Sequence, residues 1–89
     1  MELYGAFDLH SNNSHLAVID AQDKRVCSKK LPNAPPLILR ALEPYQADLV
    51  GIVVESTFNW YWLVDLLMEQ GYRVHLASFF LLEKDPDRK

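Results

Sequence analysis

Two short apolar runs that each end in an acid decide the fold of this chain: LYGAFD at residues 3–8 and LVGIVVE at residues 49–55. Both runs have the composition of β-strands, so Asp8 and Glu55 are expected at the carboxyl edges of two strands. In open α/β sheets, binding sites form at this edge. Two acids on neighbouring parallel strands can share one divalent cation through their oxygens. The alternative interpretation is that both acids simply begin loops.

The segments around these runs predict an α/β protein with the element order β-β-β-α-β-α-β. Three strands joined by short polar turns come first and are expected to form an antiparallel meander. Apolar spacing then predicts a helix, a strand buried on both faces, an amphipathic helix and a last short strand. The predicted segments are residues 3–9, 15–20, 24–31, 37–42, 49–54, 60–68 and 73–77. This order is typical of the first part of a ribonuclease-H-like mixed sheet, in which the first strand lies beside the fourth and parallel to it.

Composition narrows the class of protein. The 89 residues make one small domain, 49% of them are hydrophobic, and the formal net charge is −3. This charge argues against a free-standing nucleic-acid-binding domain, because such domains usually carry a basic patch. The single cysteine, Cys27, excludes an internal disulfide and fits a reducing, cytoplasmic location. No apolar stretch approaches membrane-spanning length, so a soluble protein with no membrane partner is expected.

Other ionisable residues are weighed as site residues. His10 follows Asp8 by two positions and so falls on the same face of the strand. It is interpreted either as a contact to a phosphate or water, or as an ordinary surface residue. His75 lies in an apolar strand and is interpreted as a core residue. Asp85 and Asp87 belong to a polar terminal run with alternating charges and are interpreted as solvent-facing.

Two clusters of larger side chains carry ambiguous signals. The basic cluster, interpreted as the solvated face of a hairpin rather than a DNA contact, consists of Lys24, Arg25, Lys29 and Lys30. The aromatic cluster, interpreted as core or interface rather than a base-stacking surface, consists of Phe58, Trp60, Tyr61 and Trp62.

Longer segments carry a family resemblance. FDLHSNNSHLAVID at residues 7–20 and GIVVESTFNWYWLVDLLMEQGYRVHLA at residues 51–77 resemble the N-terminal region of the DEDD transposases. These insertion-element enzymes contain a domain similar to the Holliday-junction resolvase RuvC. They include relatives of the pilin-gene-inverting recombinase and of the bridge-RNA-guided recombinases. The likeness runs from Leu3 to Ala77.

The resemblance implies a ribonuclease-H-like fold, four acids that bind Mg²⁺ or Mn²⁺, and cleavage and joining of DNA strands, in some members with a guide RNA. By motif match, Asp8 takes the place of the first acid and Glu55 that of the second. The last two acids and the family's serine domain are not identifiable, because residues 78–89 do not follow the family pattern. The chain is therefore interpreted as a truncated RuvC-like domain, residues 1–78, with a divergent tail, residues 79–89, that is frayed or helical.

Three functions remain open at this stage. The first is the metal-binding half of a transposase catalytic domain that is inactive alone. The second is a non-catalytic remnant that forms a homo-oligomer or binds a full-length transposase. The third is an actin-like or sugar-kinase half-domain, which is disfavoured because the turn SNNS at residues 11–14 lacks the glycines of a phosphate-binding turn.

Overall fold

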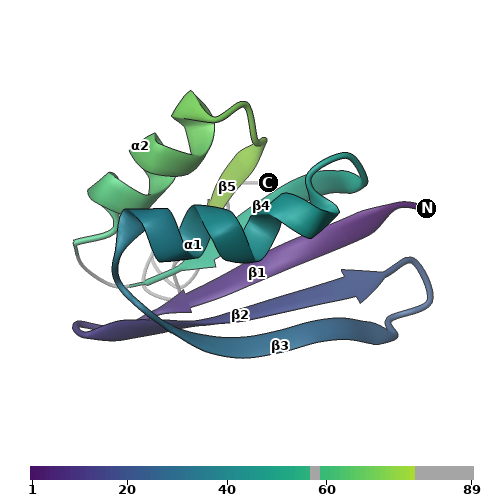
Figure 1. The fold of residues 1–89 in the computed structure, drawn as a ribbon, viewed down its shortest axis with the longest axis horizontal. Helices are drawn as coiled ribbons and strands as arrows, with labels where there is room; N and C mark the ends of the chain where they lie inside the picture. The colour runs from purple at the N-terminus through teal and green to yellow at the C-terminus, as the bar shows by residue number, and fades with distance from the viewer. Residues whose placement is uncertain (57–58, 78–89) are drawn as a thin grey trace, which may run out of the picture.

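A five-stranded mixed sheet forms the centre of the molecule, with the strand order β3-β2-β1-β4-β5 (Figure 1). The computed structural model describes residues 1–56 and 59–77. Its elements are β1 (Leu3–Leu9), β2 (Asn13–Asp20), β3 (Arg25–Pro32), α1 (Pro35–Leu42), the 3₁₀ helix η1 (Glu43–Tyr45), β4 (Leu49–Glu55), α2 (Tyr61–Glu69) and β5 (Val74–Ala77). The predicted order β-β-β-α-β-α-β is confirmed, and η1 is an addition to it.

The first strand lies at the centre of this sheet. β1 pairs antiparallel with β2 and parallel with β4, while β4 pairs parallel with β5. Buried and exposed residues alternate strictly along β1, because successive side chains of a strand point to opposite faces of the sheet. β1 therefore has one face toward the core and one face away from it.

Both helices contribute to a core on a single face of the sheet. The buried hydrophobic residues of the strands are Leu3, Phe7, Leu9, Leu16, Val18, Cys27, Ile52 and Val54, and those of the helices are Ile38, Ala41, Leu42, Leu63 and Leu67. Figure 1 shows α1 lying across the front of the sheet. We call the opposite face, which carries Tyr4, Ala6 and Asp8 of β1, the open face, because no described element covers it.

Because only one face of the sheet is covered by the described elements, two expectations about burial were wrong. β4 was expected to be buried on both faces, but Val50 and Val53 are 41% and 38% exposed. His75 was expected in the core, yet its side chain is exposed, because it pairs with Val53 and shares the open face. Apolar strand composition alone does not distinguish one covered face from two.

The boundaries of α2 follow local chemistry. The helix begins at Tyr61 after Trp60, which supplies no side-chain cap. It ends at Glu69, and Gly71 follows with a φ of 91°, a conformation that glycine adopts without steric cost. The tail predicted for residues 79–89 lies outside the described residues. In the part of the chain that is described, no helix is long and apolar enough to cross a membrane.

Neighbouring positions on α2 provide a test of the one-sided core. Leu67 is fully buried, whereas Met68 is 58% exposed. We expect Leu67→Ala to lower the free energy of unfolding by about 2–5 kcal/mol, because it removes buried apolar volume and leaves a cavity. Met68→Ala should change it by less than about 0.5 kcal/mol. Urea unfolding followed by circular dichroism measures both, and equal midpoints for the two variants would contradict this core.

Candidate functional site

The two acids of the apolar runs lie side by side at one edge of the sheet. Asp8 and Glu55 are register partners in the parallel pairing of β1 with β4, and both strands end at this edge (Figure 1). Neighbouring strands are about 4.8 Å apart, so the two side chains project from adjacent backbone positions. Both residues are exposed and occupy the open face. The arrangement thus presents two carboxylates to the solvent at the carboxyl edge of two parallel strands.

A histidine lies beside the first acid. His10 Nε2 is 3.3 Å from Asp8 Oδ2, and the two side chains are 61% and 56% exposed. An exposed pair of this kind contributes little to stability, because water screens the charges. Its relevance is chemical: an imidazole nitrogen is within reach of any phosphate or water that approaches Asp8.

The turn that carries His10 is held in place by Asn33, a residue that sequence reasoning missed. The Asn33 side-chain amide donates to the His10 carbonyl oxygen at 2.7 Å, and its own oxygen accepts from the Ser14 hydroxyl at 2.6 Å. Ser14 is fully buried, so this hydrogen bond satisfies a polar group inside the protein. Asn33 therefore ties the β1–β2 turn to the segment that enters α1.

The acid pair matches the oxygen chemistry of a divalent cation. Mg²⁺ is commonly held by one or two carboxylates together with waters and substrate phosphates. Within residues 1–56 and 59–77, no group of three or more His, Cys, Asp or Glu side chains is arranged to hold a metal ion. Asp85 and Asp87 lie outside the described residues. The described residues thus fit part of a carboxylate metal site, with Asp8 and Glu55 as its two oxygen donors.

The aromatic residues next to this edge belong to the structure of α2. Trp60 and Trp62 pack against the core, and the rings of Trp60 and Tyr61 stack with centroids 4.2 Å apart. Tyr61 remains 62% exposed. Phe58 lies outside the described residues. The interpretation of these residues as structural holds for both tryptophans.

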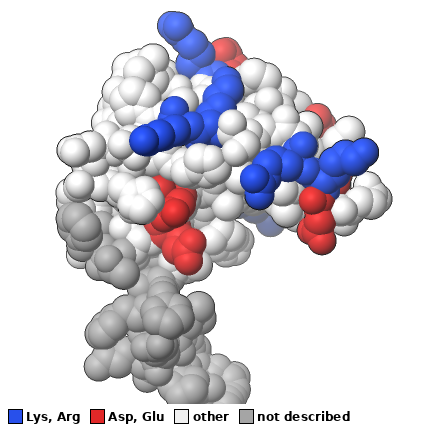
Figure 2. Space-filling view, turned by 90° about the horizontal axis from the view of Figure 1, so that it is seen from below, with Lys and Arg blue, Asp and Glu red and all other residues white. Residues whose placement is uncertain are grey.

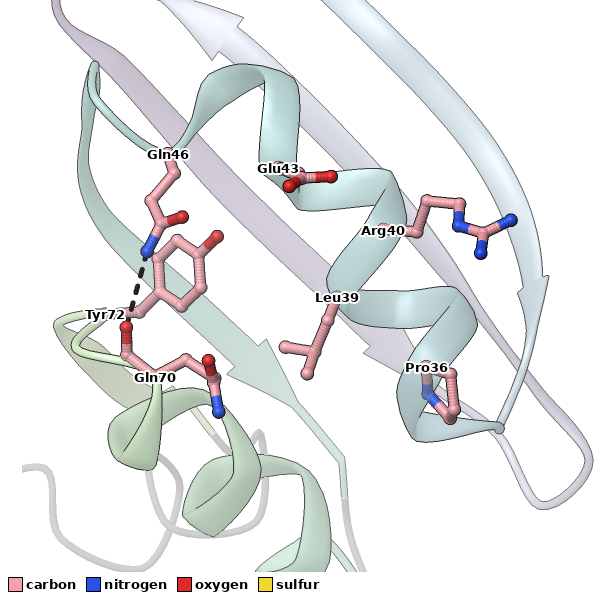
Figure 3. Close-up of a pocket in the computed structure, with 7 residues that line it drawn as sticks. All are labelled: Pro36, Leu39, Arg40, Glu43, Gln46, Gln70 and Tyr72. Carbon is pink, nitrogen blue, oxygen red and sulfur yellow. Dashed lines mark hydrogen bonds between the residues drawn. The ribbon is translucent and has the colours of Figure 1, made fainter.

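A hollow lies on the helix side of the sheet. Its volume is about 270 Å³, and it opens between α1 and the segment that leads from α2 into β5 (Figure 3). A hydrogen bond of 3.4 Å from Gln46 to the Gln70 carbonyl oxygen crosses one side of it. Burial, and secondarily the Glu43 carboxylate, raise the pKa of Tyr72 in its wall. Because ligands of open α/β sheets bind at the carboxyl ends of strands, we place the candidate site at Asp8 and Glu55 instead.

Comparison with known proteins bears on the fold. Among solved structures, the RuvC protein of T. thermophilus in complex with a Holliday junction substrate is similar to this chain, with a TM-score of 0.67. The fold is RuvC-like. The match covers 99% of this chain and 71% of that chain at 10% sequence identity, and at that identity it speaks for the fold alone. A ribonuclease-H-like α/β fold is thereby confirmed. No protein-family model matches the chain, and neither does any curated protein sequence.

Asn33 offers a test of how the turn beside the site is held. We expect Asn33→Ala to lower the free energy of unfolding by about 1–3 kcal/mol, because it leaves the buried Ser14 hydroxyl without this partner. Amide hydrogen exchange in the β1–β2 turn should become faster in the same variant. Asn12→Ala is the matched control, since no Asn12 side-chain hydrogen bond exists among the described residues. Equal exchange rates in both variants would show that Asn33 does not fix the turn.

Proposed function

We propose that this chain is part of a DEDD transposase or recombinase and acts in metal-dependent cleavage and joining of DNA strands during transposition. The observation that carries the proposal is the pairing of Asp8 with Glu55 at the carboxyl edge of two central parallel strands. The RuvC-like fold and the resemblance of residues 7–20 and 51–77 to these transposases support it. The RuvC structure contains a Holliday junction, which supports DNA as the substrate class.

In this proposal Asp8 and Glu55 are catalytic residues that hold Mg²⁺ or Mn²⁺. Such an ion, when bound, polarises a phosphodiester and stabilises the charge that develops on its oxygens. The contribution of the two carboxylates is to bind and orient the cation, and His10 stands beside Asp8 to contact a phosphate or water. Two protein ligands give weak binding, because a tight site needs more oxygens than these.

We propose further that the chain neither cleaves nor joins DNA alone. The resemblance implies four acids and a serine domain, and the described residues supply two acids at this edge. Partners in the full reaction would then be DNA, a guide RNA in the manner of the bridge-RNA-guided relatives, and further copies of the chain. A cytoplasmic setting agrees with the single free cysteine.

A second candidate function is association without catalysis. Tyr4 and Val53 are each 38% exposed on the open face, and Ala6 and Ala17 lie between or beside them. Exposed apolar side chains that form a continuous area are typical of surfaces that bind another protein. In this alternative the chain is a remnant that forms a homo-oligomer or binds a full-length transposase through this face.

Metal binding tests the first candidate. We expect Mn²⁺ to broaden the amide NMR signals around Asp8 and Glu55, with excess Mg²⁺ reversing the effect, and Asp8→Asn to abolish the broadening. Asp65→Asn is the matched control, because Asp65 is an exposed acid on α2 away from the sheet edge. Micromolar binding that persists in Asp8→Asn would contradict the site. Metal-dependent nicking of branched DNA that disappears in Glu55→Gln would overturn the claim that the chain is inactive alone.

Sedimentation at several concentrations tests the second candidate. We expect the parent chain to self-associate and Val53→Lys to remain monomeric, since a charge on the open face is costly to bury. Met68→Lys, which places the same charge on the exposed side of α2, should associate like the parent. A monomeric parent at high concentration would rule out association through the open face.

A further inference from the structure

We propose that Lys30, together with Asn12 and Asn13, binds the phosphate backbone of the nucleic-acid substrate next to the Asp8–Glu55 pair. The identity of the substrate rests on the proposed function, whereas the binding surface itself does not depend on cleavage. Four features of the described residues carry the inference: a row across the sheet, a hollow at its end, the charge of Lys30, and the spacing to the acids.

Lys30 lies in the same transverse row as the two acids. In the strand registers, Lys30 pairs with His15, His15 pairs with Asp8, and Asp8 pairs with Glu55. Register partners point to the same face of a sheet, so all four side chains belong to the open face. The row thus leads from a cation at the outer strand, through an imidazole, to the two carboxylates.

A hollow lies where this row reaches β3. It has a volume of about 310 Å³ and is lined by Asn12, Asn13, Lys30, Leu31 and Pro32. The ammonium group and the two side-chain amides supply hydrogen-bond donors. Pro32, which pairs with Asn13 on the open face, supplies an apolar wall. Proteins contact DNA phosphates and sugars with donors of this kind. The hollow therefore has the chemistry to take a phosphate and its sugar.

The ammonium group of Lys30 is available to a ligand. Among the described residues it takes part in no ion pair. Figure 2, seen from the side where β3 lies, shows Lys and Arg side chains in separate groups, with Asp and Glu side chains between and beside them. Lys29 pairs with the buried Leu16 and therefore belongs to the opposite face. The basic cluster that was interpreted as one solvated face is thus divided between the two faces of the sheet.

Lys30 lies close to the acids along this row. Lys30 is two strands away from Asp8, which corresponds to about 10 Å at about 4.8 Å per strand. A nucleic-acid strand with one phosphate at the acid pair can therefore bring a nearby phosphate of the same strand to Lys30. The attraction there offsets the repulsion between phosphates and the two carboxylates.

NMR titration tests the proposal without requiring cleavage. We would titrate the ¹⁵N-labelled chain carrying Asp8→Asn and Glu55→Gln, which removes the repulsion of the acids, with a single-stranded thymidine oligonucleotide. The largest shifts are expected at Asn12, Asn13 and Lys30. Adding Lys30→Gln should make the fall of log affinity with log salt concentration less steep by about 0.7. This change corresponds to about a fivefold to tenfold loss of affinity at about 50 mM NaCl. Lys29→Gln, with the same charge change on the other face, should change affinity less than twofold.

Three results would overturn the proposal: no binding at low salt, an unchanged salt slope in Lys30→Gln, or an equal loss in Lys29→Gln. The outcome is separate from that of the proposed function. If Mn²⁺ fails to bind at Asp8 but Lys30→Gln shows its specific loss, the backbone-binding surface stands and the metal site fails. If Mn²⁺ binds but Lys30→Gln behaves like its parent, the metal site stands and the binding surface fails.

Discussion

The parallel pairing of β1 with β4 is the constraint on which the rest of the structure depends. It joins residues far apart in sequence, and its register decides which side chains share a face. A shift of one residue along a strand moves every side chain to the opposite face. Phe7 would then leave the core and Asp8 would enter it. The apolar residues that alternate with Asp8 and Glu55 therefore hold the two acids on the outside of the sheet.

Because both helices pack on one side, the molecule has two unlike faces. The helix side holds the buried leucine, isoleucine and valine side chains, and the open side holds the acids, three histidines and a row that ends in Lys30. Small and apolar residues such as Ala6 and Val53 occupy the middle of this open side. The acid pair and Lys30 thus lie at the carboxyl edge of the sheet, next to a more apolar area.

The sequence predicts the strand order and the meeting of the acids well, because both follow from short connections and from the apolar runs. The bounds of β1 agree with the structure, and the element order differs only by the short helix η1. The role of Asn33 could not be predicted, because its two partners are 19 and 23 residues away and the contacts depend on tertiary folding. The exposure of His75 was also missed, since its apolar neighbours do not show which face of a strand is covered.

β3 is an edge strand of the sheet, and this position has a consequence for pairing with other polypeptides. An edge strand leaves backbone N–H and C=O groups without sheet partners on one side, and a strand of another polypeptide can form hydrogen bonds with them. β3 carries Lys29 and Lys30 on opposite faces and ends at Pro32, and charges and proline both discourage such pairing. Two copies of this chain paired through β3 would bring lysines close together on both faces of the sheet. The edge strand β3 is therefore unfavourable to pairing with a second copy, and it carries a cation on each face of the sheet.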